Sequence, residues 1–142
     1  MKTNCIFIVL GIILFGASCT FKKGEIPIVP DNCKAGHTGN VSVYVFMKHE
    51  EHQIGNLKNY RDTVYIKYNA VTSPGTEPTD YDSTFIGDYP SDFVLIPNLS
   101  CGNYFIYEVG FNNIHSERAT GEMVLKVEHN DGVMNVTIEG SE

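Results

Sequence analysis

Histidine, serine and acidic residues are the first candidates for chemistry in this 142-residue chain, and they form no known catalytic pattern. The nearest pattern is His49-Glu50-Glu51-His52, whose two histidines are three positions apart. On one turn of helix such a pair can hold a metal, but a solvated loop explains it equally well. The sequence has no G-x-S-x-G nucleophile elbow and no glycine-rich phosphate loop. We therefore expect no enzyme activity, no cofactor and no metal site.

The N-terminal region has the order of a secretory signal. Lys2 precedes an apolar run from Ile6 to Phe15, and small residues at 16–18 follow the run. The ten residues of this run are too few for a bilayer-spanning helix, which needs about 20. We expect residues 1–18 to be a signal peptide that is removed from the mature chain.

The end of this signal, Gly16-Ala17-Ser18-Cys19, resembles the lipobox of bacterial lipoproteins, with glycine in the place of the usual leucine. Lipoproteins of the Bacteroidetes type tolerate this change. The resemblance implies that the Cys19 thiol takes a diacylglyceryl group and that its freed amine is then acylated. Two or three acyl chains suffice for stable membrane anchoring. The alternative is an ordinary cleaved signal, or an uncleaved anchor, with Cys19 an incidental thiol.

The residues after Cys19 bear on the location of the anchored protein. Thr20 stands where an aspartate would resemble an inner-membrane retention signal, so the resemblance implies the outer membrane. Lys22-Lys23 stand where surface-exposed lipoproteins of this type often carry acidic residues. This difference favours the periplasmic face over the cell surface.

Two cysteines, Cys33 and Cys101, remain when Cys5 leaves with the signal and Cys19 is lipidated. Exported proteins fold in an oxidising compartment, so we expect these two to pair. The bridge would pin a tether, residues 19–39, to one end of the folded domain. The alternative is two separate thiols.

The composition indicates one folded acidic domain. Hydrophobic residues make up 42% of the chain, which is typical of a globular protein. The chain has 10 Lys+Arg against 17 Asp+Glu, a formal net charge of −7. A chain without a basic stripe has little to neutralise phosphates, which argues against a nucleic-acid partner.

From residue 40 onward, apolar residues alternate with polar or aromatic ones in several short runs separated by turn residues. This pattern predicts an all-β sandwich or barrel. The seven expected strands lie near 41–48, 63–68, 84–86, 93–96, 104–111, 123–128 and 134–138. Residues 49–60 are expected to form one turn of helix at most. We expect a seven-stranded antiparallel, immunoglobulin-like sandwich over residues 40–142.

The segment from Asp92 to Ile106 resembles the F-x-L-x-x-L-x-x-G-x-Y-x-I pattern of prealbumin-like sandwiches. These include Cna B-type repeats, transthyretin-like domains and carboxypeptidase regulatory-like domains. The resemblance implies that Leu99 closes the end of the core, that Gly102 makes a tight turn, and that Tyr104 and Ile106 point inward. Function varies widely within this fold class, so the fold alone supplies none.

Glu108 has the same parity as Tyr104, so its side chain can face the core. In Cna B-type repeats, a glutamate at the matching position promotes an isopeptide bond between a lysine and an asparagine. Lys48 and Asn135 are the nearest candidates by strand, but neither clearly shares the inward face. A polar residue at a strand end is the favoured interpretation of Glu108.

Aromatic residues occupy outward positions on three of the expected strands, if the valines at 41, 43 and 45 face inward. These aromatic residues are Tyr44, Phe46, Tyr65, Phe105, Tyr107 and Phe111. Outward faces of antiparallel sheets are normally polar, so an aromatic one needs a reason. Either the six form a binding surface, or the loops at 49–60 and 70–80 fold over them as a second small core.

Two short segments, Asp62-Thr63-Val64 and Asp82-Ser83-Thr84, resemble the O-glycosylation site of Bacteroidetes exported proteins. The resemblance makes Thr63 and Ser83 candidate acceptors of a glycan.

Together these patterns predict a non-catalytic outer-membrane lipoprotein whose sandwich binds an envelope protein or a glycan. It would meet the membrane through its covalent lipid. The alternatives are a purely structural accessory of an envelope complex, or an unrecognised enzyme.

Replacing Cys19 by alanine tests the anchoring prediction. Cys19→Ala should leave unprocessed precursor, because the modified thiol directs cleavage in lipoproteins. Intact mass of the wild-type mature chain should show acyl chains on a protein that starts at residue 19. A mature chain cut elsewhere and free of lipid would contradict the prediction.

Overall fold

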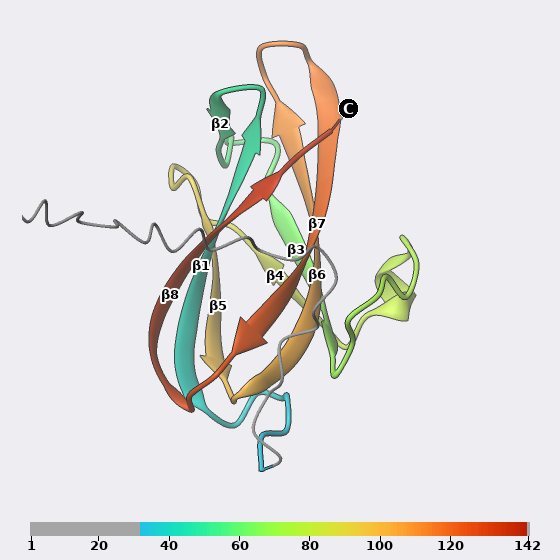
Figure 1. Cartoon of the computed structure of the whole chain (residues 1–142). Coiled ribbons are helices and arrows are strands. Elements are labelled where there is room, and N and C mark those ends of the chain that lie inside the picture. The colour runs from blue at the N-terminus through green and yellow to red at the C-terminus, as the bar shows by residue number, and fades with distance from the viewer. Residues whose placement is uncertain (1–31, 142) are drawn as a thin grey trace, which may run out of the picture.

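The computed structural model describes residues 32–141, which form a sandwich of two β-sheets (Figure 1). The strands are β1 (Asn40–His49), β2 (His52–Ile54), β3 (Thr63–Tyr68), β4 (Ser83–Ile86), β5 (Val94–Leu99), β6 (Gly102–Asn112), β7 (Glu117–Val127) and β8 (Asp131–Glu139). A short 3₁₀ turn, η1 (Pro78–Asp80), lies between β3 and β4. The expected all-β sandwich is confirmed, with eight strands in place of seven. The expected signal peptide and Cys19 lie outside the described residues.

The first sheet is built around β1. Strands β5 and β2 pair antiparallel with successive halves of one edge of β1, and β8 pairs with the other edge. The β1–β8 pair is parallel, which departs from the expected antiparallel arrangement. Alternation along a strand tells which side chains share a face, but it does not give the direction of the neighbouring strand.

The second sheet has the order β4-β3-β6-β7 and is antiparallel throughout. Its longest pairing joins β6 to β7, from Gly102 opposite Val127 to Asn112 opposite Glu117. The two sheets face each other across the core, and β8 swings from the first sheet toward the edge of the second (Figure 1). There Ser141 makes a two-bond bridge with Thr120 of β7.

The core follows the alternation of β1. Its inward residues, Val41, Val43, Val45 and Met47, are at most 1% exposed. Their partners on β8 stay in register, with Val43 opposite Met134 and Met47 opposite Ile138. Because the side-chain period of a strand is two, a slip of one residue would expose this whole set to solvent.

The segment after β1 differs from the expected helical turn. Glu50 and Glu51 both have positive φ, 52° and 46°, as the two central residues of a type I′ hairpin require. The hairpin pairs His49 with His52 and forms the short strand β2. Glutamate lacks the Asn-Gly signature of such turns, which is why the sequence did not indicate this hairpin.

One end of the sandwich is closed by the segment that precedes β1. Cys33 and Cys101 form a disulfide, as expected. The Tyr104 hydroxyl accepts a hydrogen bond from the Gly36 amide at 2.9 Å and donates to the Ser100 carbonyl at 2.7 Å. Gly102 has a φ of +154°, and a Cβ there would lie 2.5 Å from the Ala35 nitrogen. Leu99, Tyr104 and Ile106 are fully buried, so this turn takes the form that the sequence pattern implied.

Removing the disulfide should destabilise the domain, because the bridge spans 68 positions and restricts the unfolded chain. Cys101→Ser, or Cys33→Ser, should lower the free energy of unfolding by ~2–5 kcal/mol in denaturant titrations. The double variant should resemble either single one. Equal stability of wild type and both single variants would show that the bridge does not hold this end closed.

Candidate functional site

The outer face of the first sheet carries a patch of apolar side chains, which we call the β1 face: Tyr44, Phe46, Phe93 and Leu95. The Phe93 ring packs edge-on against Tyr44 and Phe46, with centroids 4.9 and 5.9 Å away. Leu95 lies directly across from Tyr44 on β5 and is 40% exposed. The three rings are half-buried, and with Leu95 they form an apolar surface that solvent reaches.

The other predicted aromatic residues lie on the opposite side of the molecule, on the outer face of the second sheet. Tyr65 and Tyr107 are cross-strand neighbours with ring centroids 6.2 Å apart. Tyr81, from the loop between β3 and β4, packs on both rings and is only 9% exposed. Its hydroxyl donates to the Gly75 carbonyl at 2.7 Å. This loop stands on the side of β3 and β6 away from β1 (Figure 1).

The six aromatic residues therefore form no single surface. Tyr44 and Phe46 belong to the open β1 face, whereas Tyr65 and Tyr107 are packed under Tyr81. Phe105, on the same side as Tyr107, is 4% exposed. Alternation along a strand predicts whether a side chain faces the core or the outside, but it does not predict which of the two sheets the strand joins. Of the two alternatives, cover by a loop is found on the second sheet, where Tyr81, directly after the 70–80 loop, packs on Tyr65 and Tyr107.

The last of the six, Phe111, lies in a groove of about 420 Å³, which we call the arginine groove. It is lined by Asn59, Tyr60, Arg61, Val109, Gly110, Phe111 and Arg118. The Tyr60 ring stacks on Phe111, with centroids 4.2 Å apart and planes 12° apart. Tyr60 and both arginines were missed in the sequence, because they come together only when the 55–62 loop meets the β6–β7 hairpin.

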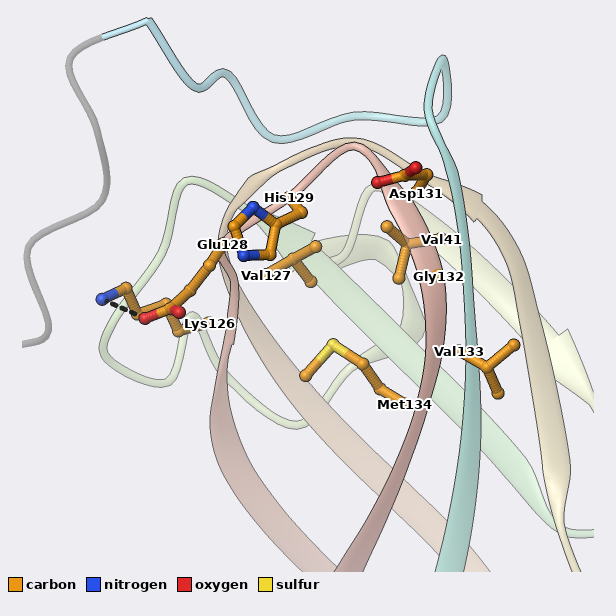
Figure 2. A pocket seen from close by; sticks show the side chains of 9 residues that line it. All are labelled: Val41, Lys126, Val127, Glu128, His129, Asp131, Gly132, Val133 and Met134. Carbon is orange, nitrogen blue, oxygen red and sulfur yellow. Dashed lines mark ion pairs between the residues drawn. The ribbon is translucent and has the colours of Figure 1, made fainter.

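A second hollow, of about 300 Å³, lies where β7 turns into β8 (Figure 2). Val41, Val127 and Met134 line its apolar part. At its rim the Lys126 ammonium and the Glu128 carboxylate form an ion pair of 2.8 Å. The hollow is thus apolar with a charged rim, and the Lys126 ammonium at this rim is already paired with Glu128.

Two carboxyl groups, Asp62 and Glu108, are buried inside the sandwich at 2% and 1% exposure. Asp62 Oδ1 and Glu108 Oε2 have no hydrogen-bond partner within residues 32–141. Gly110 makes room for Asp62, since a Cβ there would lie 2.8 Å from Oδ1. Lys48 and Asn135 are both exposed, so the structure does not bring these candidate isopeptide partners to Glu108. Glu108 also lies within β6 and is buried, which differs from the favoured interpretation of a polar residue at a strand end.

Burial raises the pKa values of both Asp62 and Glu108. Desolvation, with the charge of Asp62 as a second cause, raises the pKa of Glu108 from 4.5 to about 8. Desolvation also raises the pKa of Asp62 to about 6, against a smaller lowering by a backbone hydrogen bond from Phe111. Glu108 is therefore a neutral acid at pH 7, enclosed in the core.

The remaining sequence candidates lie within or beside the strands. His49 packs edge-on against His115 at 5.8 Å, and its Nδ1 lies 3.1 Å from the Asn112 amide nitrogen. Thr63 is half-buried in β3, and the Ser83 hydroxyl lies 2.6 Å from the Tyr68 hydroxyl. Within the described residues, no group of three or more histidine, cysteine or acidic side chains is arranged to hold a metal.

Comparison with known proteins identifies no relative. No protein-family model, no curated protein and no solved structure matches this chain. In the described part, no helix is long and apolar enough to span a bilayer.

The buried acids make stability depend on pH. Below about pH 4.5 Glu108 is protonated in both the folded and the unfolded chain. As pH rises, the unfolded chain releases this proton first, so the free energy of unfolding falls until about pH 8. Glu108→Gln should remove most of this slope and be more stable than wild type at pH 8, measured by denaturant titration.

Glu122→Gln, at an exposed position on β7 cross-strand from Tyr107, is the matched control and should keep the wild-type slope. A wild-type domain whose stability rises between pH 5 and 8 would contradict the assignment of a neutral buried acid.

Proposed function

We propose that this chain is a non-catalytic, lipid-anchored module that binds a partner protein of the cell envelope through the β1 face. The observation that carries the proposal is the open apolar patch formed by Tyr44, Phe46, Phe93 and Leu95. Large contiguous apolar patches are uncommon on monomers and mark interaction sites. The opposite sheet shows the contrast, because there the chain covers its own aromatic rings with Tyr81.

The make-up of the β1 face suits a protein partner. Its centre is aromatic and aliphatic, and the neighbouring outward residues Asn135 and Thr137 of β8 are exposed and polar. An apolar centre with a polar rim is the usual anatomy of a protein interface. A sugar would also need converging hydrogen-bond donors, and the four side chains of the face offer only the Tyr44 hydroxyl.

A non-catalytic role is supported by the placement of the acids. The two carboxyls with strongly raised pKa values, Asp62 and Glu108, lie inside the core, where a substrate does not reach them. Catalytic groups with shifted pKa values normally line a cleft.

In this proposal, acyl chains on Cys19 hold the module at the outer membrane, on its periplasmic face. From Cys19 to the disulfide at Cys33 the chain advances by 14 residue steps. At about 3.4 Å per residue they reach at most about 50 Å. This length would let the sandwich contact a partner that stands off from the lipid surface.

Placing a charge on the β1 face tests the proposal. Leu95→Lys should abolish co-isolation of the partner protein from native envelopes, because a lysine there would be buried unpaired in the interface. Partner proteins would be quantified by mass spectrometry after mild cross-linking of the tagged chain. Thermal stability should change little, since the position is solvent-exposed.

Val124→Lys is the control, because Val124 is 38% exposed and Leu95 40% exposed, on opposite sheets. It should retain the partner. Equal recovery with both variants, or no partner with wild type, would refute a protein-binding role of the β1 face.

A further inference from the structure

The arginine groove contains both arginines of the chain. Arg61 precedes β3 and Arg118 lies on β7, 57 positions later in the sequence. The chain has a net charge of −7, yet no carboxylate is among the residues that line this groove. A site where an acidic protein gathers its only guanidinium groups is suited to an anion.

The aromatic part of the groove is held in place before any ligand binds. Phe111 on β6 lies directly opposite Arg118 on β7, and Tyr60 stacks on Phe111. A tight turn fixes Tyr60, with the Leu57 amide donating to the Tyr60 carbonyl at 2.8 Å. One face of the Phe111 ring is thereby occupied, while Tyr60 remains 54% exposed. The groove thus offers one accessible aromatic ring.

The loop behind Tyr60 is anchored by a buried amide. Asn56 is 3% exposed and accepts a hydrogen bond from the Asp62 amide at 2.8 Å. Its own amide group donates to the carbonyls of Ser91 at 3.2 Å and Phe93 at 3.0 Å. A preorganised loop loses little entropy when a ligand binds, which favours recognition of a small molecule.

The charges in and beside the groove favour a single negative charge on the ligand. Arg61 donates to the Gly87 carbonyl at 3.0 Å and lies 3.6 Å from the Asp88 carboxylate. Arg61 is therefore partly compensated, although Asp88 is exposed and its screening by water is strong. Arg118 forms no ion pair within residues 32–141, so its guanidinium is the uncompensated positive charge of the groove. A carboxylate matches this balance better than a phosphate dianion.

We propose that the arginine groove binds an acidic sugar, a pyranose that carries a carboxylate. The C–H face of the ring packs on Tyr60, Arg118 takes the carboxylate through its planar fork, and Asn59 with Arg61 donates to ring hydroxyls. A volume of about 420 Å³ accommodates one or two such rings. The site is separate from the β1 face, so each proposal can fail without the other.

Calorimetric titration of the full chain with trigalacturonic acid tests the inference, with neutral galactotriose as the matched probe. The acidic trisaccharide should bind saturably and at least 10-fold more tightly than the neutral one. Arg118→Gln and Tyr60→Ala should each weaken its binding at least 10-fold. Tyr89→Ala is the control, because Tyr89 is also 54% exposed but does not line the groove.

Three results would overturn the inference, provided that the melting temperatures of the variants match that of wild type. The first is absent or equal binding of the acidic and neutral sugars. The second is unchanged affinity in Arg118→Gln or Tyr60→Ala. The third is tighter binding of a sulfated galactose trisaccharide or of adenosine monophosphate than of trigalacturonic acid, which would assign the groove to another anion.

Discussion

The position of β1 in the middle of its sheet constrains the rest of the structure. It is paired on both edges, and every second side chain from Val41 to Met47 is excluded from water. The parallel pairing with β8 carries the chain past β1 until the Gly140 amide meets the Lys48 carbonyl. From there Ser141 reaches β7, where Gly121 is needed because a Cβ would lie 2.4 Å from Ile138. The two sheets are thus joined by the strand that also completes the first sheet.

The same arrangement determines which surfaces remain available. The loop between β3 and β4 is long enough to fold back, and it places Tyr81 over the outer rings of the second sheet. The connections of β1 are a two-residue hairpin to β2 and the disulfide-bound segment at the other end, and both lie at the ends of the sandwich. Tyr44 and Phe46 are consequently left at the surface, which supports the proposed role of the β1 face.

Much of the fold could be predicted from the sequence, since local alternation determines which residues are buried. The inward residues of β1 followed from parity, the buried Tyr104 from the resemblance of its segment to prealbumin-like sandwiches, and the Cys33–Cys101 pairing from elimination. What could not be predicted depends on long-range contacts. The direction of β8, the division of the aromatic residues between two sheets, and the meeting of Arg61 with Arg118 are set by strand order, which periodicity does not encode. The Glu50–Glu51 hairpin was missed because its residues are uncommon in such turns.

The central claim is that the β1 face is open on the isolated module and covered by a partner in the envelope. Hydroxyl-radical footprinting, read by mass spectrometry on the purified chain and on native envelopes, measures this directly. The account predicts strong oxidation of Phe93 and Leu95 in the purified chain and protection of both in envelopes, while Tyr89 and Ile114 are oxidised equally in the two samples. Equal oxidation of Phe93 and Leu95 in both samples would contradict it.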